Sequence, residues 1–379
     1  MIETESSKRS LNLNREVRQN GFPTFAAMKD QVDIRKLSKE ELIDLFSEMG
    51  EKPFRGKQVF EWLWTKRARS FEEMTNLPVA LREKLEEKFI IRTMRIADKQ
   101  VSADGTIKYA FKMSDGPVVE GVLIPTKNRT TACISSQVGC SLSCKFCATG
   151  RLKRLRNLEA YEIYDQVAEI YRDAEILREK PLSNIVYMGM GEPLLNYKNV
   201  LESTFRISDD KGLGMSPKRM TISTAGIAKM IEKMGDDEVR FNLAVSLHAA
   251  NDEKRNKIMP INETNNLDVL ADALRHFYDK TGSRVTYEYI IFKDFNDTMQ
   301  DARELADFAQ IVPCKINIIE YNPIDDGEFE QADPEVVDAF AEYLESCNIV
   351  VNVRRSRGKD IDAACGQLAN KNKAALKID

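Results

Sequence analysis

The sequence predicts an α/β protein whose larger part is a partial barrel of six parallel βα units. Beyond Thr130 the chain alternates short apolar runs with helical segments, which is typical of strands and helices around a parallel sheet. Polar clusters directly follow five of the six runs, as expected for a ligand site at the carboxyl ends of the strands. The 379 residues are enough for two domains, one of them large.

Residues 1–33 are polar and aperiodic, and they predict a flexible extension. A small helical accessory domain is predicted over residues 34–95. Its first helix is predicted to start at Ser38, which opens a capping-box sequence and is followed by apolar residues at helical intervals. Further helices are indicated over 57–66 and 79–89. The aromatic stripe of the first of these two has the spacing of a buried helix face, so we favour packing over base stacking.

A short β extension is predicted over residues 96–129. Its apolar runs are separated by Asp104-Gly105 and Asp115-Gly116, two dipeptides that are typical of tight turns between antiparallel strands. These strands would link the helical domain to the larger part of the chain.

The barrel and its C-terminal segment are assigned to residues 130–370, and a tail to residues 371–379. Each predicted strand is a short apolar run that precedes a segment with helical periodicity. The six strands are predicted over residues 131–135, 184–188, 219–223, 241–247, 285–291 and 315–319.

The composition is that of an ordinary globular protein, with 42% hydrophobic and 31% charged residues. No apolar run approaches the length of a membrane span, and the start of the chain lacks the features of a secretory signal. We therefore expect a cytoplasmic protein with no membrane partner, acting as a monomer. In that compartment, seven cysteines are more often ligands or redox-active thiols than disulfides.

The distribution of charge is more informative than its total. A net charge of −4 argues against a protein that coats nucleic acid indiscriminately. Residues 121–158, however, contain no Asp or Glu, and this basic island would attract a polyanion such as RNA to one place. A charge run is often only a solvated surface, which is the alternative. The candidate RNA-binding side chains are Lys145, Arg151, Lys153, Arg154 and Arg156.

Three of the seven cysteines, Cys140, Cys144 and Cys147, lie within eight residues. Their spacing cannot place all three on one face of a strand, and glycines flank them, so they predict an irregular loop around a metal. Three thiolates suit a cluster of four irons with one iron left open. A zinc site completed by Cys133 is one alternative, and buried packing cysteines are another.

Polar residues follow most of the other candidate strands, where a parallel barrel binds its ligands. The segment Gly189–Pro193 exposes backbone and includes Glu192, whose carboxylate could accept hydrogen bonds from a ligand ammonium group. Other polar residues that follow the candidate strands could have simpler roles. Ser223 could cap a helix, His248 could be a strand-end histidine whose hydrogen bonds are made within the protein, and Asn322 before proline could form a turn. The other clusters are Ser223 to Gly226, Ser246-Leu247-His248 and Tyr321-Asn322-Pro323.

Three motifs resemble those of a known family. They are the segment Cys133–Cys140 with the cysteine loop that follows it, the segment Gly189–Asn196, and the segment Arg357–Leu368. The cysteine loop, the Gly189 turn and the barrel pattern are similar to the radical S-adenosylmethionine (SAM) superfamily. More narrowly, the three motifs resemble bacterial enzymes that methylate C2 of adenine in RNA, and this resemblance covers residues 37–368. It implies a partial (β/α)6 radical SAM barrel with a small N-terminal helical domain and a short β extension.

The resemblance also implies cofactors and residue roles. A [4Fe-4S] cluster would be held by the three loop cysteines, and SAM would bind at its open iron. Cys365 would accept a methyl group, Cys133 would release the product by forming a disulfide with Cys365, and Glu120 would be the base that removes the C2 proton. The residues that would hold SAM are Gly191, Glu192, Ser223, Ser246, Leu247, His248 and Asn322.

The substrates implied by the resemblance are adenine in the peptidyl-transferase region of 23S ribosomal RNA (rRNA) and adenine next to the anticodon in some transfer RNAs (tRNAs). A reducing electron donor such as flavodoxin would be a partner. Two other functions compete with this one. A sister activity methylates C8 of the same ribosomal adenine, and a zinc-stabilised, noncatalytic RNA-binding protein would need no SAM.

Overall fold

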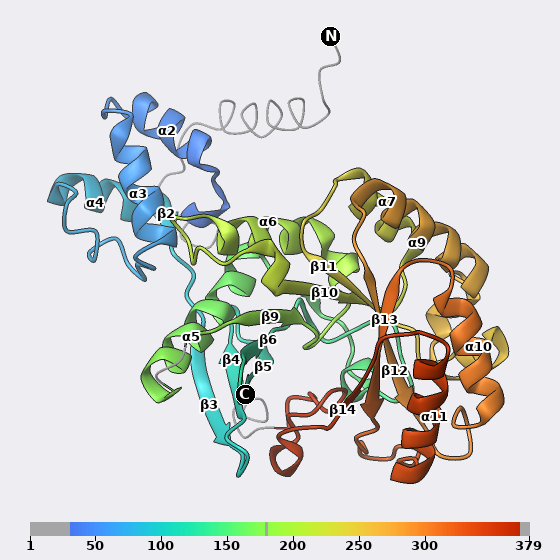
Figure 1. Ribbon diagram of the computed structural model, residues 1–379. Helices are drawn as coiled ribbons and strands as arrows, with labels where there is room; N and C mark the ends of the chain where they lie inside the picture. Colours follow the sequence, from blue (N-terminus) through green and yellow to red (C-terminus); the bar gives the residue numbers. More distant parts are fainter. Residues whose placement is uncertain (1–30, 179–180, 372–379) are drawn as a thin grey trace. The chain divides into compact units, whose positions relative to one another are not determined.

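The computed structural model describes residues 31–178 and 181–371, and its chain divides into two compact units, one up to Arg92 and one from Thr93 (Figure 1). Most of the predicted N-terminal extension and of the predicted tail lies outside the described residues. The β extension predicted from the sequence belongs to the same unit as the barrel.

The described part of the first unit, residues 31–92, contains three α-helices, as the sequence predicts. Ser38 caps the first helix in a complete capping box. The second helix begins at Phe54, three residues earlier than predicted, and its aromatic face is buried, which confirms the packing role. Gly56 allows the first two helices to approach closely, because an added Cβ would lie 2.8 Å from the Ile43 backbone. The elements are β1 (Val32–Asp33), η2 (Ile34–Lys36), α2 (Lys39–Glu48), α3 (Phe54–Trp64), α4 (Val79–Lys88) and β2 (Phe89–Ile90).

The second unit is built on one ten-stranded sheet with the order β14-β13-β12-β11-β10-β9-β6-β5-β4-β3. The six predicted parallel strands are confirmed as β6 and β9 to β13. A seventh strand, β14, pairs in parallel with β13. The prediction missed β14 because it is short, polar in part and only half-buried at the sheet edge. The parallel strands are β6 (Thr130–Cys133), β9 (Asn184–Tyr187), β10 (Met220–Thr224), β11 (Asn242–Ser246), β12 (Val285–Ile291), β13 (Cys314–Glu320) and β14 (Val351–Arg354).

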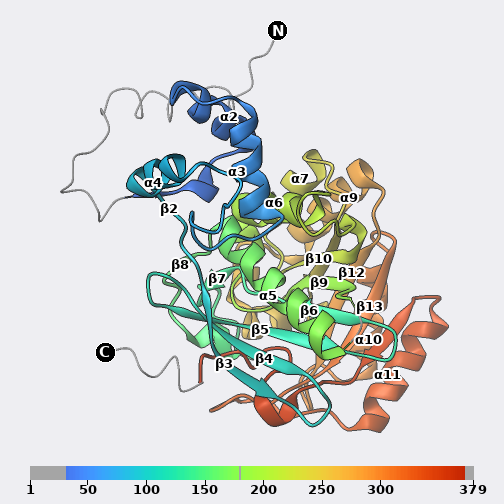
Figure 2. The ribbon, with the colours of Figure 1, turned by 90° about the vertical axis from the view of Figure 1, so that its left-hand side faces the viewer.

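The β extension continues this sheet in antiparallel fashion, as Figure 2 shows. Its strands are β3 (Arg95–Val101), β4 (Ile107–Lys112) and β5 (Val118–Pro125). The turns between them contain Gly105 and Gly116, whose φ angles are +83° and +106°. These left-handed conformations suit glycine and confirm the two predicted turns.

Helices follow the parallel strands and lie along the outer face of the curved sheet (Figure 1). Strand β12 is buried along its whole length, as expected for a central strand of a parallel sheet. No helix in the described part of the chain is long and apolar enough to cross a membrane. The helices are α5 (Ala160–Arg178), α6 (Tyr197–Ser208), α7 (Ala228–Asp236), α8 (Asp252–Ile258), α9 (Leu267–Thr281), α10 (Met299–Ala309) and α11 (Pro334–Ser346).

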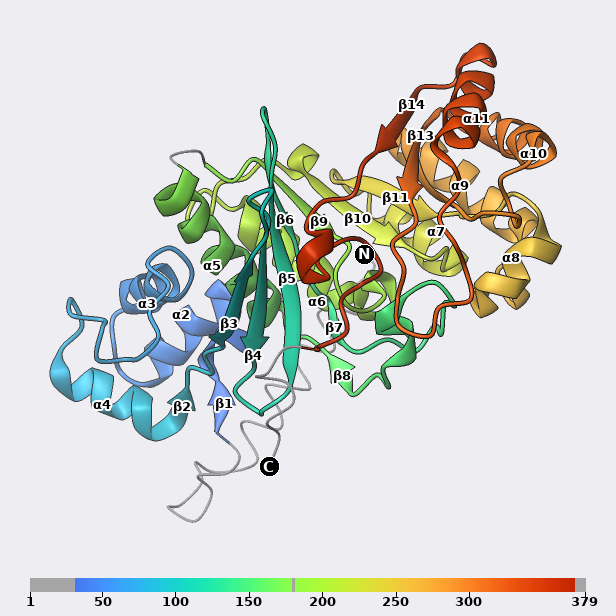
Figure 3. The same cartoon turned by 90° about the horizontal axis from the view of Figure 1, so that it is seen from below.

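The segment after β14 runs back toward the opposite edge of the sheet (Figure 3). Gly358 N donates to the Asp104 carboxylate at 3.0 Å, and the Asp360 carboxylate accepts from the Ser102 hydroxyl at 2.6 Å, so this segment is bonded to the β3–β4 turn. Further along, Ala369 N donates to the Glu120 carboxylate on β5 at 2.9 Å. We call residues 355–370 the C-terminal strap. It bridges the two unpaired edges of the open sheet.

Candidate functional site

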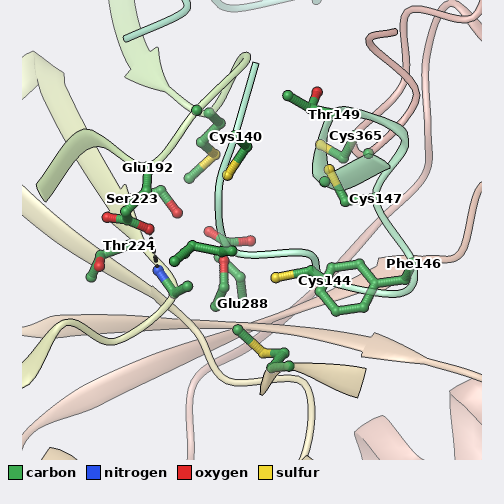
Figure 4. Close-up of a pocket in the computed structure, with 18 of the residues that line it drawn as sticks. Cys140, Cys144, Phe146, Cys147, Thr149, Glu192, Ser223, Thr224, Glu288 and Cys365 are labelled. Atoms are coloured by element: carbon green, nitrogen blue, oxygen red, sulfur yellow. Dashed lines mark hydrogen bonds between the residues drawn. The ribbon is translucent and has the colours of Figure 1, made fainter. Parts of the chain in front are cut away.

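A pocket lies at the carboxyl ends of the central parallel strands (Figure 4). Its empty space, including open solvent at the mouth, measures about 890 Å³. Residues from four of the five predicted strand-end clusters and from the C-terminal strap line it, and the cluster Tyr321-Asn322-Pro323 does not. Among them are Cys140, Cys144, Cys147, Gly191, Glu192, Ser223, Ser246, His248, Glu288, Ile319 and Cys365.

The cysteine loop is held in shape by local hydrogen bonding. Strands β7 (Gln137–Val138) and β8 (Arg156–Asn157) pair across its base. Gly139 has a φ of +75°, and an added Cβ would lie 2.3 Å from the carbonyl oxygen of Lys153, so only glycine fits there. Lys145 N donates to the carbonyl of Ile258 at 3.0 Å, which ties the loop to the end of α8.

The three loop thiols fit an iron-sulfur cluster better than a single metal ion. In the described residues, no three His, Cys, Asp or Glu side chains converge on one point, as a zinc ion would require. A four-iron cluster instead binds each thiolate through a different iron, so its ligands stand apart around the pocket. Burial raises the pKa of Cys140 to about 11 and also raises the pKa of Cys144 and Cys147, so metal binding would release protons.

Glu192 lies at the bottom of the backbone turn after β9. Its two carboxylate oxygens accept from Leu194 N at 3.0 Å and from Ala225 N at 2.8 Å. Burial nevertheless raises its pKa to about 7. Gly191 beside it has a φ of +96°, and an added Cβ would lie 2.4 Å from the Gln137 side chain. The turn therefore places one carboxylate and bare backbone against the pocket.

His248 lines the pocket in its neutral form. Its Nδ1 accepts from Ile290 N at 3.1 Å, so the proton is assigned to Nε2. Burial, and next the charge of Arg255, lower its pKa to about 3. The edge of its ring meets the Phe146 ring with centroids 4.6 Å apart. Ser223 and Ser246 also line the pocket, as predicted.

Two of the predicted SAM-binding residues lie behind the pocket surface. Leu247 is fully buried, and its carbonyl accepts from Arg255 Nε at 3.1 Å. Asn322 donates from Nδ2 to the carbonyl of Cys365 at 3.3 Å and to that of Glu320 at 3.2 Å. Neither side chain is among those that line the cavity. Asn322 therefore positions the C-terminal strap next to the pocket.

Cys365 and Cys133 come close together from distant parts of the chain. Cys365 lines the pocket beside Cys147 (Figure 4), whereas Cys133 is buried at the end of β6 behind it. Both are free thiols. Burial, and next the proximity of Cys365, raise the pKa of Cys133 to about 12.

An ion pair near these thiols, in which Glu288 is buried and Arg354 is half-exposed, was not foreseen from the sequence. Arg354 Nη1 lies 3.3 Å from the Glu288 carboxylate, which lines the pocket, and the charge of Arg354 acts on both Cys133 and Cys365. Glu288 could have been noticed as the one charged residue in the otherwise apolar run Val285–Ile291. Arg354 could not, because β14 itself was not predicted.

The structure does not bring Glu120 into the pocket. Its carboxylate is fully buried on β5, where it accepts from Ala369 N at 2.9 Å and Asn370 N at 3.1 Å. Lys108 Nζ lies 3.8 Å from its other oxygen. In this conformation the carboxylate holds the end of the C-terminal strap.

The basic island divides into two kinds of side chain. Arg156 forms bidentate pairs with Asp115 and with Glu162, all at 2.7–2.8 Å, so its charge is already neutralised by acids outside the island. Arg151 donates to the backbone carbonyls of Asp325 and Asp326. Among these candidates, the exposed side chains with neither a carboxylate nor a backbone-carbonyl partner in the described part of the chain are Lys145, Lys153 and Arg154.

Comparison with known proteins agrees with this geometry. Residues 134–309 match the family model of the radical SAM superfamily, and residues 32–91 match that of the N-terminal domain of a ribosomal RNA large subunit methyltransferase. A crystal structure of a radical SAM methyltransferase from Sphaerobacter thermophilus has a TM-score of 0.84 at 36% identity, covering 89% of this chain and 99% of that one. The fold and the site thus define a radical SAM enzyme, which confirms the predicted [4Fe-4S] cluster and SAM as its cofactors.

Similar proteins assign the chain to one family within the radical SAM enzymes. A probable dual-specificity RNA methyltransferase RlmN from Cytophaga hutchinsonii is 62% identical over 89% of this chain and 93% of its own length. Another from Salinibacter ruber is 42% identical over 93% of this chain and 98% of its own length. The chain belongs to the RlmN family.

Proposed function

We propose that the protein methylates C2 of adenine in 23S rRNA, in the peptidyl-transferase region, and in tRNA, next to the anticodon. The relatives named above are RNA methyltransferases with dual specificity, which supports two kinds of RNA substrate. The observation that carries the proposal is the position of Cys365, a fourth pocket thiol that comes from the C-terminal strap and stands beside the three loop cysteines. A radical enzyme that only cleaves SAM has no need of this thiol.

The pocket residues would divide the work between the two cofactors. When bound, the cluster and SAM supply a carbon radical and a transferable methyl group. Cys140, Cys144 and Cys147 would hold the cluster. Glu192 and the backbone around Gly191 would bind the ammonium group of SAM, and Ser223, Ser246 and neutral His248 would hydrogen-bond its other polar groups. Leu247 would act from behind, because its carbonyl fixes the backbone between Ser246 and His248, and Asn322 would position the C-terminal strap through the carbonyl of Cys365.

The two remaining thiols would handle the methyl group. Cys365 would carry it as a thioether. After this methyl group has lost a hydrogen atom to the carbon radical, its carbon would join C2 of the base while still bonded to sulfur, and the C2 hydrogen would leave as a proton with one electron passing to the oxidised cluster. The thiolate of Cys133 would then attack the Cys365 sulfur, so that an S–S bond forms and the sulfur–carbon bond breaks. The carbon would keep the electron pair and take up a proton. Because burial raises the pKa of Cys133 to about 12, this thiol must lose its proton as it reacts.

We propose Glu120 as the base that removes the C2 proton, with one condition set by its position. The end of the C-terminal strap occupies its carboxylate in this conformation. Ala369 and Asn370 would have to move away before the carboxylate could reach a base in the pocket.

SAM binding is expected to weaken at low pH through Glu192. A carboxylate binds an ammonium group only when ionised, and burial raises this pKa to about 7. Protonation of the free site below that pH should therefore oppose binding, and affinity should fall about tenfold between about pH 8 and pH 6. Equilibrium dialysis of labelled SAM against cluster-loaded protein measures this. The Glu192→Gln variant should bind more weakly at both pH values with no such dependence, and an unaltered pH profile in that variant would contradict the assignment.

RNA binding is expected to involve the exposed part of the basic island. Changing Lys145, Lys153 and Arg154 together to glutamine should weaken RNA binding and lower the slope of log affinity against log salt by about 2, at roughly 0.7 per phosphate contact. Arg156→Gln is the contrasting variant, because that side chain is committed to Asp115 and Glu162. It should lower the melting temperature and leave the salt slope unchanged. The same slope in the triple variant and the native protein would exclude these contacts.

The partners are completed by an electron donor. We propose that a reduced protein such as flavodoxin delivers the electron to the cluster, and that the enzyme works as a monomer in the cytoplasm.

One incubation tests the proposed function. Anaerobically reconstituted protein is mixed with reductant, SAM labelled in its methyl group, and RNA fragments from the peptidyl-transferase region or tRNA, and the nucleosides are then separated by mass spectrometry. Labelled 2-methyladenosine in both RNAs is expected. Recovery of 8-methyladenosine would assign the sister activity instead, and a colourless protein that contains zinc and leaves RNA unmodified would assign a binding role.

A further inference from the structure

Arg255 on α8 is a fully buried arginine without a carboxylate partner among the described residues. Arginine remains charged at neutral pH, and a guanidinium removed from water is strongly destabilising unless an anion lies near it. All of its hydrogen-bond acceptors are uncharged oxygens. They are the carbonyls of Ala225 at 2.7 Å, Leu247 at 3.1 Å, Ser246 at 3.4 Å and Asn265 at 3.5 Å, and the side-chain oxygen of Asn262.

These acceptors belong to the wall of the pocket. Ala225 directly follows β10, and Ser246 and Leu247 lie at the end of β11. The same two strand ends supply Ser223, Ser246 and His248 to the cavity. One guanidinium therefore binds the backbone of two neighbouring strand ends and fixes their separation.

Helix α8 also contacts the cysteine loop. The carbonyl of Ile258 accepts from Lys145 N at 3.0 Å, immediately after Cys144. Ile258 and Met259 form part of the hydrophobic cluster against which Cys144 and Cys147 pack. The ionisable groups that act most strongly on Arg255 are Cys144 first and Asp252 second. The buried charge thus lies close enough to the cysteine loop to interact electrostatically with Cys144.

We propose that Arg255 is a positioning residue for the cluster, whose buried positive charge stabilises the reduced state while its hydrogen bonds hold the ends of β10 and β11. The inference rests on the proposed cluster site. Thiolates become the missing anions when the loop binds iron. Reduction then adds one more negative charge to the cluster, and a nearby fixed cation in a medium of low dielectric constant attracts that charge strongly. The reduction potential should therefore be higher than it would be without Arg255.

The experiment separates the charge from the hydrogen bonds. Arg255→Gln removes the charge, whereas Arg255→Lys keeps the charge but loses the fork of N–H donors of the guanidinium group. Lys257→Gln removes an exposed charge from the same helix and is the matched control. Each protein is reconstituted anaerobically, its iron and sulfide are counted, and its cluster is titrated with mediators while the reduced form is followed by electron paramagnetic resonance.

In Arg255→Gln, the ratio of reduced to oxidised cluster at a given potential should fall at least tenfold, which for one electron corresponds to a potential about 59 mV lower. Arg255→Lys should stay within about threefold of the native ratio, and Lys257→Gln should match the native protein. An intact cluster with an unmoved potential in Arg255→Gln would overturn the inference and leave the proposed function standing. A native chain that binds no iron would instead refute the proposed function.

If Arg255→Gln retains no iron, Arg255→Lys decides the matter. Native iron content and a nearly native potential in that variant would support the role of the charge. Loss of iron in the lysine variant as well would show that only the hydrogen-bonded fork matters, and the inference would be wrong.

Discussion

Changing Cys365 to alanine is expected to abolish RNA methylation, by roughly a thousandfold or more, because the variant lacks the sulfur that would carry the methyl group into the pocket. The iron content should stay at the native level, since the three loop cysteines are unchanged. Cleavage of SAM by reductant should also persist. The measurements are the yield of 2-methyladenosine by mass spectrometry, iron per chain, and 5′-deoxyadenosine released.

A matched control exists in Cys347, a free and half-buried cysteine just after α11. Cys347→Ala should methylate RNA at the native rate. Substantial methylation by the Cys365 variant would show that the methyl group passes directly from SAM to the base, and the thioether step would have to be abandoned.

The second large effect is expected for Cys133→Ala. Without a partner thiol, Cys365 cannot be detached from the product, so turnover should stop after one event, with RNA joined covalently to the protein. A labelled RNA should then migrate with the protein on a denaturing gel, at up to about one RNA per chain. The buried position of Cys133 means that alanine leaves only a small cavity, so folding should survive.

The double variant Cys133→Ala with Cys365→Ala provides the control, because it removes the sulfur that would hold the adduct. It should give no covalent RNA. Rapid release of methylated RNA by the single variant Cys133→Ala would exclude the disulfide step and assign Cys133 to packing.

Much of the barrel could be predicted because its signals are local. Strand β12 is mostly apolar and β-branched or aromatic, with Glu288 as its one charged residue, and the spacing of apolar residues marks the faces of α2 and α3. The three cluster cysteines follow one another along the chain, so their spacing alone indicates a shared centre. In each case the residues that determine the feature lie close together in the sequence.

What could not be predicted depends on residues that are distant in sequence. Arg156 looks like a phosphate ligand until Asp115 and Glu162 are seen on either side of it. Arg255 stands in a short polar helix, and nothing near it in the sequence indicates complete burial. Glu120 was expected in the pocket, but its neighbours in space include residues about 250 positions away. Charge alone does not reveal such pairings.

The C-terminal strap has a consequence for the order in which the site is completed during synthesis. Translation produces every strand of the sheet, the cysteine loop and the cofactor cradle before it produces Cys365. Chains begin to fold from their N-terminal parts as they emerge. The strands of a nascent barrel can therefore pair before the C-terminal strap emerges. The strap then brings Cys365 to the pocket and bonds to Asp104 and Glu120 through its backbone N–H groups. The pocket therefore gains its fourth thiol only when the C-terminal strap has bound to the sheet.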